Sequence, residues 1–223
     1  MNRKTLLKQA KRLALGLAAL AIAATPSFAQ TYDLCASDGT VTMPDTTVVP
    51  IWGYADITGG GACTTGLASL PGPELRLLET DATLTINLSN ALTVPVSFFV
   101  PGYRSTVTGG DPGIFTDQVP PGDTATYTIS VRPGTYLYHS GTDITTQVPM
   151  GLYGALVVDV AAGQAYSDVS YLQDQVLVYS EIDANLNNDP AGFGGARVIN
   201  WNPQYFLING QAHPSSGDIT INT

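Results

Sequence analysis

The chain has 223 residues, with 18 acidic side chains against nine basic ones and only two cysteines and two histidines. Five of the nine basic residues fall within the first twelve positions, so the rest of the chain carries four arginines, no lysine and a net charge of −14. Such an acidic chain is expected to repel nucleic acid and anionic membrane surfaces. The acidity fits a salty habitat and a cation-binding surface equally well.

Residues 1–29 have the pattern of a secretory signal peptide. Basic side chains precede an apolar run at residues 13–24, and Ser27-Phe28-Ala29 fits the small-x-small cleavage rule. A retained anchor helix is the alternative, but the run is shorter than the ~20 residues that span a bilayer. We therefore expect export, cleavage after Ala29, and a periplasmic or secreted mature protein that is no longer attached to the membrane.

Cys35 and Cys63 are the only cysteines. An even pair in an exported protein predicts a disulfide, whereas a metal site would need a histidine or a second cysteine at ligand spacing. The bond would close a loop of about 28 residues and contribute ~3 kcal/mol by restricting the unfolded chain. It would also tie the glycine-rich stretch at residues 59–61 to the first strand.

The pattern along the mature chain is that of β-strands. Apolar and polar residues alternate at 83–89 and at 126–131, as in strands with one face exposed to water. Residues 152–158 form a continuous apolar run that predicts a central strand, and residues 176–179 and 205–208 are similar. Turn signals separate the strands at Pro71-Gly72-Pro73, Pro101-Gly102, Gly109-Gly110-Asp111-Pro112-Gly113, Pro120-Pro121-Gly122-Asp123 and Arg132-Pro133-Gly134. Short strands at this spacing indicate an all-β sandwich or small barrel with Greek-key connections.

Residues 183–198 differ from the rest because asparagine, aspartate, proline and glycine dominate them, which predicts a long polar loop. We expect three parts in the chain: the signal peptide at 1–29, the β domain at 30–182, and a tail at 183–223. The strand at 204–209 would then fold back on the first domain or offer an edge to a partner.

Three ordered segments carry a family resemblance. The first is Gly72-Pro73-Glu74-Leu75-Arg76 with the strand at 80–90, and the second is Val119-Pro120-Pro121-Gly122-Asp123 leading to Tyr127. The third is Gly134-Thr135-Tyr136-Leu137-Tyr138-His139-Ser140 followed by Met150-Gly151-Leu152-Tyr153-Gly154-Ala155-Leu156-Val157-Val158. Together they resemble the N-terminal plastocyanin-like (cupredoxin) domain of multicopper oxidases. Ile208-Asn209-Gly210 resembles the entry into a second cupredoxin domain, so the tail would be a linker and the truncated start of that domain.

The resemblance implies a cupredoxin-like Greek-key β-sandwich, copper as the cofactor, and oxidation of a substrate coupled to oxygen reduction. In that family, two histidine motifs of this domain help to hold a trinuclear copper cluster. Residues 96–102 contain no histidine where the family has H-x-H-G. In the second motif, His139 matches the first histidine and Gly141 replaces the second. His139 is therefore the one candidate metal ligand.

Two interpretations of His139 stay open: a strand residue with local hydrogen bonds, or a residual copper ligand completed by another domain or subunit. A mononuclear blue-copper site would need a cysteine that is missing between His139 and Met150, so Met150 is expected to pack and His213 to lie in an exposed loop. We predict no catalytic residues, because the chain has no G-x-S-x-G motif and too few histidines for a Ser-His-Asp triad.

Three hypotheses follow. The chain is a multicopper-oxidase-like domain, inactive alone, that needs ligands from a second cupredoxin domain or another copy of itself. Alternatively, it is a non-enzymatic exported binding or structural module whose scaffold has lost its copper sites. A weaker third hypothesis is a metal carrier that uses surface carboxylates.

Overall fold

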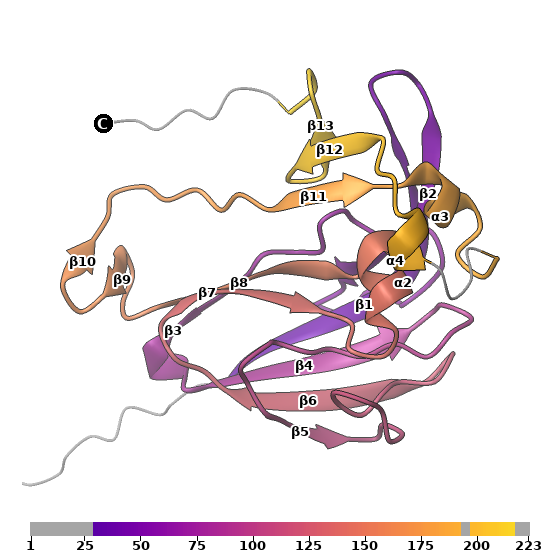
Figure 1. The fold of residues 1–223 in the computed structure, drawn as a ribbon. Coiled ribbons are helices and arrows are strands. Elements are labelled where there is room, and N and C mark those ends of the chain that lie inside the picture. Colours follow the sequence, from indigo (N-terminus) through magenta and orange to yellow (C-terminus); the bar gives the residue numbers. More distant parts are fainter. Residues whose placement is uncertain (1–28, 193–196, 217–223) are drawn as a thin grey trace, which may run out of the picture.

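Two β-sheets face each other in the computed structural model, which describes residues 29–192 and 197–216 (Figure 1). The predicted signal peptide lies outside the described residues except for Ala29. The larger sheet has the strand order β2-β1-β4-β6-β5, and the smaller has the order β3-β8-β7. The strands of the larger sheet are β1 (Gln30–Thr42), β2 (Val48–Asp56), β4 (Thr83–Asn90), β5 (Ser105–Thr108) and β6 (Thr124–Ser130). Those of the smaller sheet are β3 (Leu75–Leu78), β7 (Gly134–His139) and β8 (Tyr153–Asp159).

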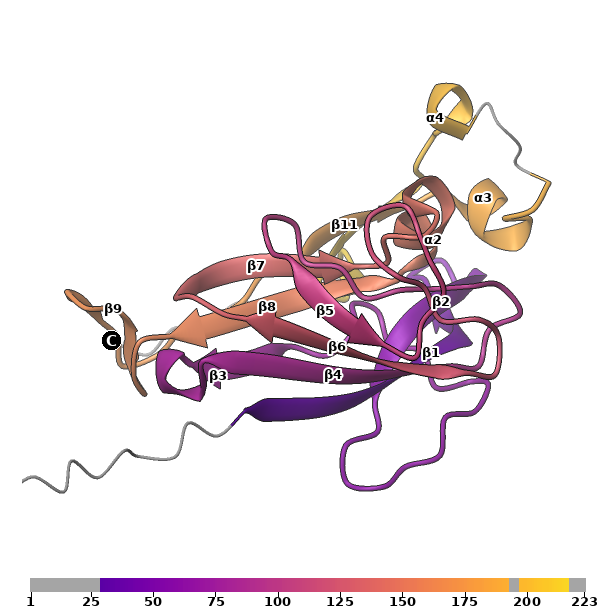
Figure 2. The ribbon, with the colours of Figure 1, turned by 90° about the horizontal axis from the view of Figure 1, so that it is seen from below.

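The sheets mix parallel and antiparallel pairs. Strand β1 pairs in parallel with β4 and in antiparallel with β2, and β3 pairs in parallel with β8. Figure 2 shows the two sheets edge-on, with β7 and β8 on one side and β4 and β6 on the other. The predicted all-β sandwich is confirmed.

The hydrophobic pattern decides which side of each strand meets the core. In β4, Leu84, Ile86 and Leu88 are fully buried while the residues between them are half-buried, because successive side chains of a strand point to opposite faces. Strand β8 is buried along its whole length, as its continuous apolar run predicted, and it lies in the middle of its sheet. Both sequence predictions are confirmed.

Four aromatic side chains fill the centre of the sandwich: Tyr54, Phe98, Tyr127 and Tyr138. Phe98 stacks on Tyr138 with ring centroids 5.0 Å apart. Each tyrosine hydroxyl donates a hydrogen bond to a backbone carbonyl oxygen, at Ser97, Asp117 and Pro73 respectively, over 2.6–2.7 Å. The hydroxyls are thereby satisfied in an apolar interior.

A third sheet with the order β11-β12-β13 lies against the edge of the sandwich. Its strands are β11 (Tyr179–Ile182), β12 (Tyr205–Ile208) and β13 (Gln211–Ala212), and it buries Ile182 and Leu207 against Met43 and Val49. The predicted strand at 205–208 is confirmed. The predicted strand at 176–179 is wrong in position, because residues 176–178 bond to Asn209 in the β12–β13 turn: Val178 N donates to Asn209 Oδ1 over 2.8 Å, and Asn209 Nδ2 donates to Val176 O over 3.0 Å.

The strand pattern along the mature chain did not predict helices, but the structure contains short ones. They are α2 (Ile144–Met150), α3 (Ala184–Asn188), α4 (Arg197–Asn200) and the 3-10 turn η1 (Glu79–Asp81), and a hairpin of β9 (Gln164–Tyr166) and β10 (Val169–Ser170) follows β8. Helix α3 corrects the prediction of a loop over 183–198: the Asp183 carboxylate accepts a hydrogen bond from Asn185 N over 3.0 Å and so caps the first turn. Within the described part of the chain, no helix is both long and apolar enough to cross a membrane.

The predicted disulfide is present. Cys35 in β1 is bonded to Cys63 in the loop after β2, at a sequence separation of 28. Cys35 itself is fully buried. The glycine-rich loop is thereby held against the first strand, as expected.

Candidate functional site

His139, the sequence-predicted metal ligand, is the last residue of β7. Its neighbour Tyr138 points into the core, so strand alternation turns the imidazole to the outer face of the sandwich. Beside it lies residue Phe99, which exchanges two backbone N–H···O=C bonds of 2.9 Å with His139. Phe98, one residue earlier, is fully buried. The segment that replaces the family's first histidine motif therefore runs alongside β7.

The imidazole of His139 makes two local interactions. Its Nδ1 is 2.8 Å from the carbonyl oxygen of Ser140, which can only accept a hydrogen bond, so the proton of the neutral ring lies on Nδ1. The Nε2 atom is left as an acceptor. The ring of Phe99 meets the imidazole edge-on with centroids 5.4 Å apart, and so occupies one side of it.

Gly141, which replaces the second histidine of the resembled motif, is tightly packed. A Cβ atom at this residue would lie 3.2 Å from Cβ of Phe99 and 3.3 Å from Cβ of Phe115, tighter than ordinary van der Waals contact. Phe115 also packs on Phe99, with ring centroids 5.7 Å apart. A side chain at position 141 would therefore require these two neighbours to shift by a few tenths of an ångström.

A network of side-chain hydrogen bonds surrounds Gly141. The amide of Gly141 donates to Ser97 Oγ over 2.8 Å, and the amide of Ser97 donates to Ser140 Oγ over 3.0 Å. Ser140 Oγ in turn donates to Gln147 Oε1 over 2.5 Å, and Gln147 Nε2 donates to Pro95 O over 2.8 Å. Ser97, Ser140 and Gln147 are all buried. Ser140 directly follows β7, and Gln147 lies in α2. The helix α2, which the sequence did not predict, therefore holds the turn that replaces the histidine motif.

The described residues do not fit the copper cluster that the resemblance implies. No three histidine, cysteine, aspartate or glutamate side chains gather in residues 29–192 and 197–216. His139 contributes one imidazole, its cross-strand neighbour is Phe99, and the cysteines are bonded to each other. Met150 is buried, in keeping with its predicted packing role, and His213 is exposed in the turn after β13, as expected. No step of an oxidase reaction can be assigned to these residues.

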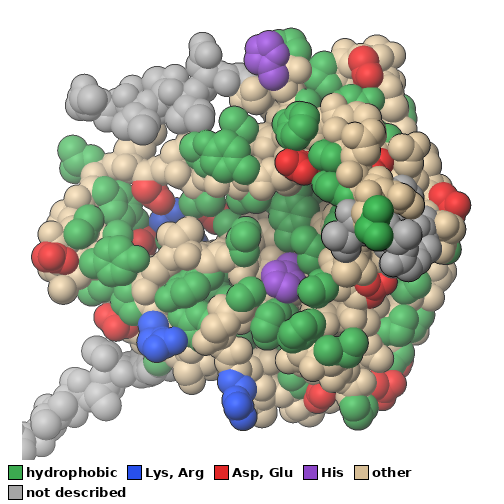
Figure 3. Space-filling model, viewed as in Figure 1, with side chains coloured by type: hydrophobic (Ala, Val, Ile, Leu, Met, Phe, Trp, Pro, Cys, Tyr) green, Lys and Arg blue, Asp and Glu red, His purple; other side chains and the backbone are tan. Residues whose placement is uncertain are grey.

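A pocket of about 280 Å³ opens beside His139. Its apolar wall comes from Leu137, Val148 and Val178, and its rim carries Glu181 and Trp201, whose indole Nε1 donates to Glu181 Oε2 over 3.3 Å. Figure 3 views this face of the molecule and shows a histidine in a hollow bordered by hydrophobic side chains. Sequence reasoning missed this pocket, because residues 137–139, 148–153, 178–181 and 201 come together only when β11 crosses beside β7 and α2.

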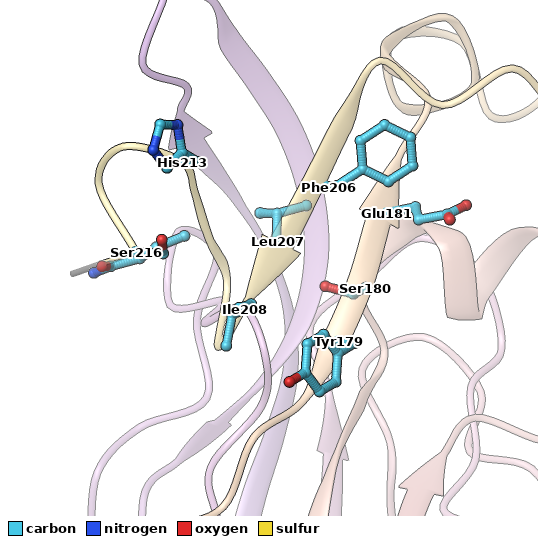
Figure 4. Close-up of a pocket in the computed structure, with 9 residues that line it drawn as sticks. Tyr179, Ser180, Glu181, Phe206, Leu207, Ile208, His213 and Ser216 are labelled. Atoms are coloured by element: carbon cyan, nitrogen blue, oxygen red, sulfur yellow. The ribbon is translucent and has the colours of Figure 1, made fainter. Parts of the chain in front are cut away.

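A second hollow of about 520 Å³ lies on the other side of β11 (Figure 4). Phe206 and Tyr179 are strongly exposed there, at 64% and 70%, and His213 sits at its edge. It is lined by neither His139 nor Trp201. The two hollows share Tyr179, Ser180 and Glu181, so β11 forms the wall between them.

These features define a cupredoxin-type β-sandwich with phenylalanine, glycine and hydroxyl side chains packed around His139. Residues 60–163 match the multicopper oxidase family. A stretch of 99 residues, 42% of this chain, is 36% identical to an L-ascorbate oxidase of Brassica rapa subsp. pekinensis and covers 17% of that protein. The chain therefore contains a cupredoxin domain of the multicopper oxidase family.

Solved structures show the same fold at low sequence identity. A blue copper oxidase from Nitrosomonas europaea aligns with a TM-score of 0.58 and 19% identity, over 82% of this chain and 54% of its own. A laccase from Botrytis aclada aligns with a TM-score of 0.56 and 23% identity, over 86% of this chain and 33% of its own. The chain thus spans about half or a third of these proteins and a sixth of the ascorbate oxidase.

Proposed function

We propose that this cupredoxin domain works without a copper cluster of its own, as a non-enzymatic binding module on a multicopper oxidase scaffold. The observation that carries the proposal is the packing around the second histidine motif, at His139 and Gly141. Phe99 covers one side of His139, and Gly141 is pressed between Phe99 and Phe115. A lost ligand alone would leave a vacant polar site, whereas here aromatic packing takes its place.

The hydrogen bonds at the same end support this proposal. Ser97, Ser140 and Gln147 satisfy one another in a buried network, and neither of the two unpaired buried side-chain atoms found in the described residues, Ser180 Oγ and Asn187 Oδ1, belongs to it. Buried polar groups that all have partners stabilise one defined arrangement. An arrangement held this way has little need of a metal for its stability.

A second candidate function is favoured by the orientation of His139. Metal-bound histidines usually donate the second ring N–H to a carbonyl or carboxylate oxygen, as Nδ1 of His139 does to Ser140 O. Nε2 would then be the atom offered to copper. In this alternative, His139 is one ligand of a site completed by a second cupredoxin domain or by another copy of the chain.

The setting that we propose is the periplasm or the exterior of the cell. The Cys35–Cys63 disulfide supports it, since such bonds persist in oxidising compartments. The acidic surface argues against nucleic acid as a partner.

Copper stoichiometry separates the two candidate functions. The full chain would be exported to the periplasm, loaded with copper, dialysed and analysed by elemental spectrometry, beside the His139→Ala variant and a His213→Ala control. Retention near zero in all three proteins supports the binding module. One copper per chain or per oligomer that is lost only in His139→Ala would overturn that proposal and establish the shared site.

A further inference from the structure

The pocket beside His139 combines an apolar wall with hydrogen-bond acceptors from Glu181 and His139. We propose that it binds a small organic cation, a primary ammonium group carried on a compact ring-containing body. The inference rests on the proposed function to this extent: His139 must be available to a ligand other than copper.

The walls of the pocket suit an apolar ring. Leu137, Val148 and Val178 present aliphatic surface, and Tyr153 and Trp201 add aromatic surface. Binding pockets generally join such walls to a few convergent polar groups. At about 280 Å³, the cavity falls below the ~300 Å³ at which pockets for drug-sized ligands begin. A ligand of this site is therefore a single ring with a short side chain.

The polar groups at the pocket select a positive charge. Glu181 is the one charged side chain that lines it, and no described lysine or arginine does so. His139 adds a second acceptor, because Nδ1 carries the proton in its bond to Ser140 O and leaves Nε2 with a lone pair. An ammonium group donates three hydrogen bonds and accepts none, so it matches the acceptors that Glu181 and His139 bring to the pocket.

Aromatic and long-range interactions favour the same charge. Tyr179 and Glu181 lie two residues apart on β11 and so point to the same side of the strand, and Trp201 is held at Glu181 by its indole hydrogen bond. Cations are attracted to the faces of tryptophan and tyrosine rings. The net charge of −9 would also raise the local concentration of cations and lower that of anions.

Three probes that share one ring test the charge preference. Isothermal titration of the full chain in buffer with a metal chelator would compare 2-phenylethylammonium, neutral 2-phenylethanol and anionic 3-phenylpropanoate. We expect the ammonium to bind about tenfold more tightly than the alcohol, and the carboxylate to give no measurable heat. Equal affinity for all three probes, or no binding of the ammonium, would overturn the proposal.

Two variants locate the binding. Glu181→Gln keeps the shape and the acceptor for Trp201 but removes the charge, so the ammonium affinity should fall about five- to tenfold while that of the alcohol stays the same. Glu79→Gln makes the same charge change in η1, away from the pocket, and should have no effect. Leu137→Trp fills the pocket from an exposed strand position and should weaken both probes. Unchanged ammonium binding in Glu181→Gln and Leu137→Trp would place the ligand elsewhere and refute this site.

Two separate measurements distinguish a failure of the ammonium site from a failure of the proposed function. Ammonium binding is measured in chelator, whereas the proposed function is judged by copper retention. If the chain retains no copper and does not bind the ammonium probe, the proposed function stands and only the ammonium site is refuted. Copper retained through His139 would remove the basis of both.

Discussion

Two pairs of neighbouring residues divide this molecule into an inner and an outer face. Phe98 and Tyr138 point inward and stack at 5.0 Å, while Phe99 and His139, each the next residue along, point outward and meet at 5.4 Å. The inner pair belongs to a core that keeps the multicopper oxidase fold. The outer pair holds one imidazole, that of His139, beside the ring of Phe99. The comparison shows that one strand serves the core and the surface separately, because strand alternation gives each face its own side chains.

The two faces also differ in how their polar groups are used. The inner hydroxyls of Tyr54, Tyr127 and Tyr138 all donate to backbone carbonyl oxygens between elements and so tie the sandwich together. On the outer face, His139 bonds through Nδ1 to the carbonyl of the next residue, and its side chain lines the pocket. The inner face therefore supports stability, and the outer face is available for binding.

The largest expected effect is on the inner face. Phe98→Ala would leave a cavity among four packed aromatic side chains and should lower the free energy of unfolding by about 3–5 kcal/mol. Phe99→Ala is the matched control: its side chain is only partly buried, and the loss of its ring contacts should cost about 1 kcal/mol. Urea denaturation of the two variants measures the difference. Equal losses would contradict the division into two faces.

The disulfide gives the next largest effect. Replacing Cys35 and Cys63 together by alanine should cost about 3 kcal/mol, because the unfolded chain regains the freedom of a 28-residue loop. Denaturant unfolding measures this loss, and nuclear magnetic resonance of the His139 imidazole monitors the outer face. We expect the imidazole signals to stay in place. A shift of these signals would mean that the two regions are coupled.

Alkaline pH should weaken the inner face. Burial raises the pKa of Tyr54, Tyr127 and Tyr138 above the ordinary value, so the unfolded chain loses these protons first. Stability from these groups is complete below about pH 10 and then falls by about 1.4 kcal/mol per pH unit for each tyrosine until the raised folded pKa is reached.

Tyr138→Phe isolates one tyrosine in that experiment. The variant loses a hydrogen bond to Pro73 O, which should cost about 1 kcal/mol at neutral pH, and its stability should then fall less steeply above about pH 10. Unfolding curves between pH 8 and pH 11 test both effects. Equal slopes for the two proteins would show that the buried Tyr138 hydroxyl does not govern the alkaline loss.

The smallest change in stability is expected for a substitution on the outer face, which should instead increase copper binding. Phe99→His places a second imidazole opposite His139 on the neighbouring segment, at positions that exchange backbone hydrogen bonds. Stability should change by less than about 1 kcal/mol, and copper binding should increase because imidazole is a preferred ligand of that metal. Copper titration of Phe99→His, with Phe99→His/His139→Ala as the control, measures the gain. Binding that is equal in both variants would exclude a cross-strand pair.

Much of the fold could be predicted because the strands carry local signals. The alternation in β4 and the apolar run of β8 predicted directly which of their side chains are buried, and the even cysteine pair predicted the disulfide. Helix α2 was missed because it has no apolar stripe and contains Pro149, and it is held by contacts such as Gln147 with Pro95 and Ser140. Strand β11 was placed too early because the partner of residues 176–178 is Asn209, which local pattern cannot reveal.

The candidate site, too, could be predicted from the sequence only in part. The sequence by itself predicted the family of the domain, the disulfide, and the absence of histidine from residues 96–102 and 141, because these depend on residue identity and order. Only the tertiary structure decided that Phe99 and Phe115 pack around Gly141 and that Glu181 and Trp201 line one pocket with His139. The physical reason is distance along the chain: residues 99, 139, 181 and 201 meet through the packing of separate strands, and no local pattern encodes those contacts.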